Sequence, residues 1–211
     1  MNNPVALLLH SGGLDSSVLG YELAKQGINF SSVFIDFDQS GKKSELKATK
    51  TTSSIFGAPL DVIEVPTLRA PFVSSPISTF RAMPNPGRGV LELGSLLLYG
   101  IAFTYAHQKG IKDVYVGLTK LDADFSKEYS QGFLDAFSKL VEEAGHPSIS
   151  LKAPFLTKTK GEVVQIGMEN LELTKATWSC IHDGDTHCGV CEGCMSRHTA
   201  FEQAGVSDPA F

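Results

Sequence analysis

The sequence predicts an α/β fold: a doubly wound, mostly parallel sheet with a small cysteine-rich segment at its C-terminal end. Short apolar runs alternate with amphipathic helical patterns along most of the 211 residues, as expected of successive βαβ units. The first apolar run is followed at once by a loop rich in glycine and serine, and all four cysteines lie at or after position 180. This length fits one domain with a small appendage, so we predict an α/β domain over 1–175 and a metal-binding, C-terminal helical segment over 176–211.

The expected elements follow one another in regular alternation. Apolar runs typical of buried strands lie at residues 5–9, 31–37, 60–65 and 112–117, and helical patterns at about 16–26, 43–57, 90–109, 128–144 and 160–168. Such a sheet is covered by helices on both faces, and its ligands bind beyond the carboxyl ends of the strands. The loop after the first strand is therefore a candidate binding site.

Residues 9–17 read Leu-His-Ser-Gly-Gly-Leu-Asp-Ser-Ser. Two glycines let the backbone approach phosphate oxygens, and the helix that follows begins with unpaired N–H groups that bind anions. The serines add hydroxyl donors, whereas the carboxylate of Asp15 among phosphates indicates a bridging Mg²⁺. The alternative is an ordinary Gly-Gly turn with a serine N-cap, but the strand, loop and helix context favours a nucleotide site.

Three further positions are weaker candidates. Asp36 and Asp38 end the second predicted strand at the same edge of the sheet, where either could contact adenosine or a metal, or both could only form a turn. Residues 66–89 are rich in proline, which favours a lid or substrate loop over a simple connection. Arg88 near its end could bind a carboxylate or phosphate, and Lys160 at a helix start could grip pyrophosphate, although both residue types are commonly just solvated.

The cysteines are spaced as Cys180-x7-Cys188-Gly-Val-Cys191-Glu-Gly-Cys194. Two-residue gaps let thiolates converge on one metal ion, and cytoplasmic proteins seldom use cysteines in disulfides. We predict a structural Cys₄ zinc site, with an iron–sulfur cluster or unligated thiols as alternatives. Metal binding is folding energy for so short a segment, so chelation is predicted to disorder residues 178–205.

Composition narrows the class of partner. The formal net charge of −5 argues against a broad nucleic-acid surface, because phosphate neutralisation by Lys and Arg supplies most of that affinity. No apolar run reaches the roughly 20 residues of a membrane helix, and the N-terminus lacks a signal-peptide pattern. We therefore expect a soluble cytoplasmic protein that acts on small molecules, without membrane or nucleic-acid partners.

Together, the loop and the cysteine segment resemble the 7-cyano-7-deazaguanine synthase (QueC) family of N-type ATP pyrophosphatases, or PP-loop enzymes, whose fold is adenine nucleotide alpha hydrolase-like. The resemblance runs nearly end to end. It includes Phe34, Asp36, Pro86, Gly87, Arg88, Gly117, Asp122, Thr159, Lys160, Glu162, Thr177, Trp178, Ser179, Arg197, Ala200, Phe201, Ala204 and Gly205 beside the loop and the cysteines.

The resemblance implies activation of the carboxylate of 7-carboxy-7-deazaguanine by ATP, giving an acyl-adenylate and pyrophosphate. Ammonia then forms an amide, and a second ATP-dependent round yields the nitrile, 7-cyano-7-deazaguanine. The implied catalytic residues are Asp15, Lys160 and Arg88, and the implied residues for ATP and Mg²⁺ are Ser11, Gly12, Gly13, Leu14, Asp15, Ser16, Ser17, Asp36, Gly117 and Asp122. The family also implies a homodimer.

The chain departs from the family pattern in three loops. After Asp122 the usual Tyr-Pro-Asp-Cys-Arg is replaced by residues 125–130, Gly89 stands for an asparagine, and residues 37–40 replace Tyr-Gly-Gln-Arg. One alternative is therefore a QueC-like amide ligase of an anti-phage system, which hands the activated carboxylate to another amine such as a protein N-terminus. A tRNA-modifying PP-loop enzyme would need a basic surface and a free thiol, and a non-catalytic nucleotide-binding module is a further alternative.

Overall fold

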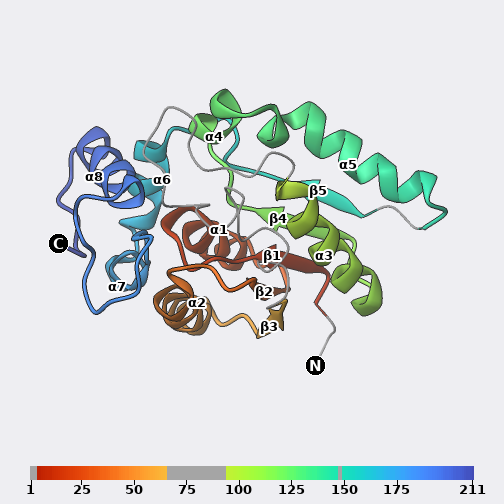
Figure 1. Ribbon diagram of the computed structural model, residues 1–211, viewed down its shortest axis with the longest axis horizontal. Coiled ribbons are helices and arrows are strands. Elements are labelled where there is room, and N and C mark those ends of the chain that lie inside the picture. Colours follow the sequence, from red (N-terminus) through yellow and green to blue (C-terminus); the bar gives the residue numbers. More distant parts are fainter. Residues whose placement is uncertain (1–3, 66–93, 147–148) are drawn as a thin grey trace.

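The computed structural model describes residues 4–65, 94–146 and 149–211. Within them, five parallel strands form one sheet in the order β3-β2-β1-β4-β5 (Figure 1). The strands are β1 (Ala6–Leu9), β2 (Phe30–Asp36), β3 (Leu60–Glu64), β4 (Asp113–Val116) and β5 (Ser150–Lys152). The α/β fold class predicted from the alternation of elements is confirmed. The whole proline-rich stretch 66–89, with Arg88 and Gly89, lies outside the described residues.

The helices cover both faces of this sheet. They are α1 (Leu14–Lys25), α2 (Lys42–Phe56), α3 (Gly94–Lys109), α4 (Lys120–Phe125), the 3₁₀ turn η4 (Lys127–Tyr129), α5 (Gln131–Glu143), α6 (Lys160–Gly167), α7 (Leu171–Ala176) and α8 (Glu192–Ala204). In Figure 1, α6, α7 and α8 gather on the left, whereas α3 and α5 lie on the right. No helix among the described residues is both long and apolar enough to span a membrane.

Two hydrophobic cores follow from the alternation of side chains along the strands. Leu8 of β1 belongs to the core formed with α1, α6 and α8, while its neighbour Leu7 belongs to the core formed with α3 and α5. Both side chains are fully buried. One apolar strand thus supplies both layers, as its uninterrupted hydrophobic run indicates.

The predicted helix at 128–144 is interrupted in the structure. The hydroxyl of Ser126 accepts a hydrogen bond from the Glu128 amide, and that of Ser130 accepts one from the Phe133 amide. Each serine caps the element that follows it, because its side chain satisfies an amide without a partner inside the helix. The stretch therefore divides into η4 and α5. The short elements β5, α4 and α7 gave no periodic signal long enough to predict.

The C-terminal segment is packed into the α/β core. Ala200 and Phe201 of α8 lie in the same hydrophobic cluster as Val18 and Leu19 of α1. The boundary near residue 175 stays a prediction, but the packing of α8 gives the segment a fixed position against the sheet's helical layer.

Candidate nucleotide and metal site

The glycine- and serine-rich loop lies where the sheet changes winding direction. β1 has β2 on one side and β4 on the other, so ligands are expected beyond the carboxyl ends of β1 and β4. A Cβ atom on Gly12, whose φ is +73°, would lie 2.4 Å from the Glu45 carbonyl oxygen, and one on Gly117 would lie 2.6 Å from the Ser16 nitrogen. The loop can approach α2 and the end of β4 this closely only with glycine at both positions.

A cavity of about 470 Å³ opens in front of this loop. It is bounded by the loop, the ends of β2 and β4, helices α3 and α4, and the start of α8. Of the residues predicted for the site, Ser11, Gly13, Leu14, Asp15, Ser16, Gly117, Asp122 and Lys160 line it. Gly12, Ser17 and Asp36 are not among the lining residues. The fold thus brings most of the predicted nucleotide-binding residues together.

Asp15 and Lys160 face each other in this cavity. The Lys160 Nζ lies 2.9 Å from the Asp15 Oδ2, and the two side chains are only 22% and 18% exposed. The other oxygen, Oδ1, is buried and has no hydrogen-bond partner in the described part of the chain. A carboxylate oxygen left without a donor is suited to a cation, so the chemistry of Asp15 fits Mg²⁺.

Two serine hydroxyls shape the inside of the loop. The Ser16 Oγ accepts a hydrogen bond from the Ser11 amide at 3.3 Å and lies 3.2 Å from the Ser11 Oγ. It donates to the Gly13 carbonyl at 3.3 Å. These bonds close the loop into a compact turn at the start of α1, where the helix N–H groups can contact an anion.

The acidic candidates outside the loop have local partners. The Asp36 Oδ1 accepts a hydrogen bond from the Asp38 amide at 2.8 Å, and Lys42 lies 3.4 Å from Asp36 and 3.0 Å from Asp38. The hydrogen bond to Asp38 and the nearby carboxylates raise the pKa of Lys42. Asp122 accepts hydrogen bonds from the amide and hydroxyl of Thr119 and so caps α4 at the cavity wall.

Sequence reasoning did not single out several side chains that line the cavity. His10 and Glu45 are buried behind the loop, and Tyr99 and Tyr129 line the opposite end. Burial, with Glu128 and Asp122 nearby, raises the pKa of Tyr129 to about 12, so its phenol stays protonated. His10 lies within the loop motif, Tyr129 lies in the 125–130 stretch noted only as a departure from the family pattern, and Tyr99 comes from α3 without any motif.

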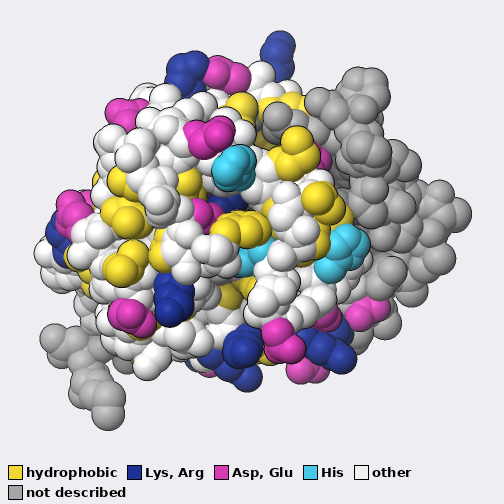
Figure 2. All heavy atoms as spheres, turned by 90° about the vertical axis from the view of Figure 1, so that its left-hand side faces the viewer, with side chains coloured by type: hydrophobic (Ala, Val, Ile, Leu, Met, Phe, Trp, Pro, Cys, Tyr) yellow, Lys and Arg dark blue, Asp and Glu magenta, His cyan; other side chains and the backbone are white. Residues whose placement is uncertain are grey.

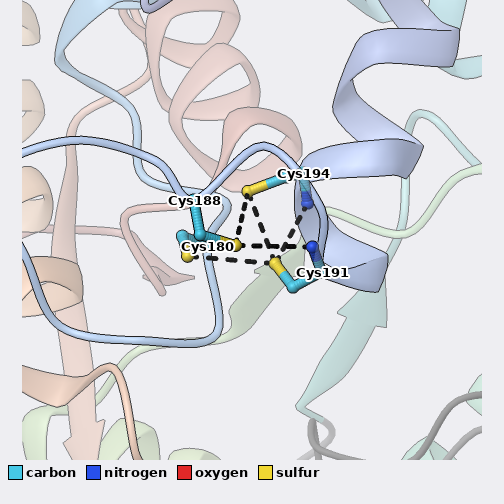
Figure 3. Close-up of side chains that lie close together, drawn as sticks. All are labelled: Cys180, Cys188, Cys191 and Cys194. Atoms are coloured by element: carbon cyan, nitrogen blue, oxygen red, sulfur yellow. Dashed lines mark hydrogen bonds between the residues drawn. The ribbon is translucent and has the colours of Figure 1, made fainter.

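The four cysteines converge on one point (Figure 3). Their sulfur atoms all lie within 4.8 Å of one another, with Cys191 3.8 Å from Cys180 and 3.4 Å from Cys194, and Cys188 3.9 Å from Cys194. Backbone N–H groups of Val190 and Cys191 lower the pKa of Cys188 to about 6. The cluster can therefore bind a metal ion.

This cysteine segment also forms part of the cavity wall. The Trp178 amide donates a hydrogen bond to the Gly12 carbonyl at 2.8 Å, which joins the segment to the loop. A Cβ on Gly193 would lie 1.9 Å from the Ser179 carbonyl oxygen, so the chain closes around the cysteines only with glycine there. Trp178, Ser179, Ile181, Glu192 and Gly193 all line the cavity.

Figure 2 shows the face that carries α7, α8 and the C-terminus, where hydrophobic side chains lie among charged ones. Exposed apolar residues of α7, of the cysteine loop before α8, of α8 and of the C-terminal tail include Leu171, Val190, Met195 and Phe211.

The sequence profile described as "Queuosine biosynthesis protein QueC" matches residues 5–205 of this chain.

The chain belongs to the QueC family. Among its relatives, the 7-cyano-7-deazaguanine synthase of Methanococcus aeolicus is 30% identical over 97% of both chains. That of Rhizobium rhizogenes is also 30% identical, over 96% of this chain and 89% of its own length. The QueC resemblance inferred from the loop and cysteine motifs is thus confirmed.

Solved structures share the fold at low sequence identity. The tRNA thiolase NcsA from Methanococcus maripaludis, solved with its four-iron, four-sulfur cluster, is similar with a TM-score of 0.55 and 15% identity, over 97% of this chain and 65% of that chain. NMN synthetase from Francisella tularensis has a TM-score of 0.51 and 17% identity, over 99% and 81% of the two chains. These two solved structures share the overall fold of this chain.

Proposed function

We propose that this QueC-family protein activates the carboxylate of 7-carboxy-7-deazaguanine with ATP and converts it with ammonia to 7-cyano-7-deazaguanine. The observation that carries the proposal is the convergence of Ser11, Asp15, Ser16 and Lys160 on one cavity. It occurs in a chain whose full-length relatives are named 7-cyano-7-deazaguanine synthases. A cavity of about 470 Å³ is within the range of small-molecule sites.

The first chemical step transfers AMP to the substrate. A carboxylate oxygen attacks the α-phosphorus of ATP, the bond to the bridging oxygen of the β-phosphate breaks, and pyrophosphate leaves. Ammonia then attacks the acyl carbon, and AMP leaves with the carboxylate oxygen while the amine loses a proton. A second adenylation, on the amide oxygen, allows loss of AMP to give the nitrile. No protein nucleophile is required, so positioning and charge neutralisation are the protein's contribution.

Positioning and charge neutralisation can be assigned to described residues of the cavity. Lys160 and Arg197 are the basic side chains among those lining the cavity, and Arg197 is held in a buried ion pair with Asp208. Lys160, whose Nζ lies 2.9 Å from the Asp15 Oδ2 beside the loop, is therefore the cation that we propose to neutralise pyrophosphate, while Ser11, Ser16 and the α1 amides hold its oxygens. Asp15 would hold Mg²⁺, which supplies charge neutralisation for the phosphates when bound.

We propose zinc as the metal of the cysteine cluster. Zn–S bonds of about 2.3 Å put the sulfurs of a regular tetrahedron about 3.8 Å apart. The sulfur separations of 3.4, 3.8 and 3.9 Å are close to this value. An iron–sulfur cubane would hold the same four sulfurs farther apart. Metal analysis of the purified protein tests the choice: about one zinc per chain is expected, and iron with acid-labile sulfide would contradict it.

A second candidate function is the amide ligase, which would stop after the first adenylation and use another amine. It is favoured by the loop that departs from the family pattern, because Phe125 and Tyr129 of that loop line the cavity. A change in this part of the cavity wall would alter which amine attacks the adenylate, or whether the amide reacts further. We also propose a homodimer, which the family resemblance implies, and sedimentation equilibrium tests this oligomeric state.

One experiment separates the two candidates. The protein is incubated with Mg²⁺-ATP, 7-carboxy-7-deazaguanine and ammonia, and products are followed by mass spectrometry together with AMP and pyrophosphate. Omission of the carboxylate is the control for unspecific ATP hydrolysis. Nitrile with about two AMP per product supports the synthase, and amide without nitrile supports the ligase. If no AMP forms with this carboxylate, both candidates are rejected.

A further inference from the structure

His10 lies directly behind the phosphate-binding loop, and its ring is held by three hydroxyl groups. The residue is 1% exposed, and Ser17 is fully buried beside it. The His10 Nε2 is 3.1 Å from both the Ser17 Oγ and the Thr52 Oγ1, and the Nδ1 is 3.2 Å from the Ser53 Oγ. These contacts join the residue that follows β1, the first turn of α1 and the C-terminal part of α2.

The hydrogen-bond network assigns one tautomer to the ring. Thr52 donates its hydroxyl hydrogen to the Ala48 carbonyl at 2.8 Å, so it can only accept from His10. The Nε2 therefore carries the hydrogen and donates toward Thr52 and Ser17, while the Nδ1 accepts from Ser53. Ser17 is in turn 3.5 Å from Thr52, toward which it donates. A neutral imidazole uses both of its nitrogens in this arrangement.

We infer that His10 is a positioning residue that ties the phosphate-binding loop to α2 through Ser17, Thr52 and Ser53. In this arrangement the Ser17 hydroxyl takes part in the hydrogen bonds that link α1 to α2. Phosphate is bound instead by the loop residues that line the cavity. Burial lowers the pKa of His10 to about 3, so the ring adds no positive charge to the site. Its contribution is geometric, and it acts through the loop without touching the reacting atoms.

A second contact between the same two elements supports this role. The carbonyl oxygen of Glu45, on α2, lies against Gly12, where a Cβ would come within 2.4 Å. Helix α2 thus backs the loop at Gly12 and again at Ser17, on either side of the residues that face the cavity. Loss of the His10 hydrogen bonds would release one of the two attachments and widen the range of loop conformations, which lowers affinity for a ligand that needs one of them.

The inference rests on the proposed function only in requiring that the loop binds phosphate. Its test compares His10→Phe, which keeps an apolar ring beside Phe56, with His10→Gln, which can still donate and accept hydrogen bonds. Ser17→Ala and the double variant His10→Phe/Ser17→Ala complete a cycle. Thr51→Ala, an exposed position on the same helix, is the matched control. Circular dichroism and thermal melting establish that each variant is folded at the assay temperature.

Affinity for Mg²⁺-pyrophosphate and for adenosine is then measured by titration calorimetry. His10→Phe is expected to weaken pyrophosphate binding about tenfold, as loss of buried hydrogen bonds at a loop would, with adenosine affinity unchanged. His10→Gln should recover most of the lost pyrophosphate affinity. The double variant should bind pyrophosphate no more weakly than His10→Phe, because both single changes break the same hydrogen-bonded link between α1 and α2.

Three results would overturn the inference. The first is an equal loss of pyrophosphate and adenosine affinity in His10→Phe, and the second is a double variant whose loss of pyrophosphate affinity is the product of the two single losses. The third is a loss of pyrophosphate affinity in Ser17→Ala but not in His10→Phe. The last of these would make Ser17 a direct phosphate ligand. Wild-type protein that binds no pyrophosphate would reject both the inference and the proposed function. Binding of pyrophosphate without AMP formation from the carboxylate would reject the proposed function alone.

Discussion

We propose that charge neutralisation in the cavity depends on Lys160. Its Nζ lies 2.9 Å from the Asp15 Oδ2 at the glycine- and serine-rich loop, whereas Arg197, the other Lys or Arg among the described lining residues, is held by Asp208. Lys160→Ala should lower kcat for AMP formation by about 10² to 10³, as removal of one electrostatic stabiliser does. Steady-state kinetics with pyrophosphate release as the readout measures it.

Lys158 provides the control for that substitution. It precedes α6 by two residues and is not among the residues lining the cavity. Lys158→Ala should therefore keep kcat within about twofold of the wild type. A Lys160→Ala enzyme as active as Lys158→Ala would show that another group neutralises the pyrophosphate.

His10 should make the free energy of unfolding depend on pH. Its pKa is about 3 in the folded protein, against an ordinary value of 6.5. Between these values the unfolded chain binds more protons, so stability is full above about pH 6.5 and falls as the pH drops toward 3. The groups around the ring, Ser17, Thr52, Ser53 and Phe56, do not titrate in this range. Burial also lowers the pKa of His187 to about 4, so the contribution of His10 is isolated by comparing the wild type with His10→Phe.

Urea unfolding of the wild type and of His10→Phe measures this linkage. The stability loss between pH 7 and pH 5 should be about 2 kcal/mol larger in the wild type than in the variant. Parallel pH profiles for the two proteins would mean that the ring is hydrated or protonated in the folded state.

At the residue scale, the sequence predicts a binding residue best where the residue type itself carries the chemistry. Ser11, Asp15 and Ser16 were predicted to bind phosphate or metal because glycine, serine and aspartate between a strand and a helix have a defined use, and all three line the cavity. Their role in binding stays a prediction. Asp122 lines the cavity but also caps α4, a double role that no spacing reveals. Tyr129 lies in the 125–130 stretch that departs from the family pattern, but its place in the cavity wall depends on how η4 packs, which the sequence does not reveal.

At the scale of elements, the C-terminal tail is fixed by one buried ion pair. The guanidinium of Arg197, on α8, contacts both carboxylate oxygens of Asp208 at 2.6 and 2.9 Å, and the two side chains are 1% and 6% exposed. Asp208→Ala would leave a buried charge without its partner, which should lower the free energy of unfolding by about 3 to 5 kcal/mol. Chemical denaturation measures it.

The comparison variant is Asp208→Asn, which removes the charge but keeps an oxygen that accepts hydrogen bonds. Its loss of stability should be smaller than that of Asp208→Ala, since part of the guanidinium remains paired. Equal stability of Asp208→Ala and the wild type would contradict a structural role for the tail.

Long periodic elements were predictable and short capped ones were not. The bounds of α1, α2 and the first four strands came within a few residues of those expected. β1 and β4 bury nearly continuous apolar runs, whereas α2 buries mostly polar side chains and β3 is largely exposed at the edge of the sheet. The helix expected at 128–144 failed at its start, where Ser126 and Ser130 form two caps in succession. Local hydrogen bonding outweighed the hydrophobic period there, as is common for serine.

At the scale of the whole molecule, the strand order explains how distant residues form one cavity. Placing β1 between β2 and β4 brings Gly117 against Ser16, and α6 brings Lys160 to Asp15. The cysteine segment closes the remaining side, because Trp178 bonds to Gly12. Both motifs, the glycine- and serine-rich loop and the cysteine segment, are visible in the sequence. Only the topology shows that the two motifs line the same cavity.

Removal of the zinc ion that we propose for the cysteine cluster should therefore weaken nucleotide binding as well as stability. The carbonyls of Cys180 and Ile181 lie against Gly41 at the start of α2, and the neighbouring Asp183 side chain accepts a hydrogen bond from the Ser44 amide at 2.9 Å. Without the four thiolate bonds this segment loses the energy that orders it, and the cavity loses the wall that it forms. Chelation is expected to lower the melting temperature by several degrees and to weaken Mg²⁺-ATP binding at least tenfold, with recovery on adding Zn²⁺. Calorimetry before and after verified metal removal measures both, and unchanged ATP affinity in metal-free protein would show that the loop binds nucleotide without support from the cysteine segment.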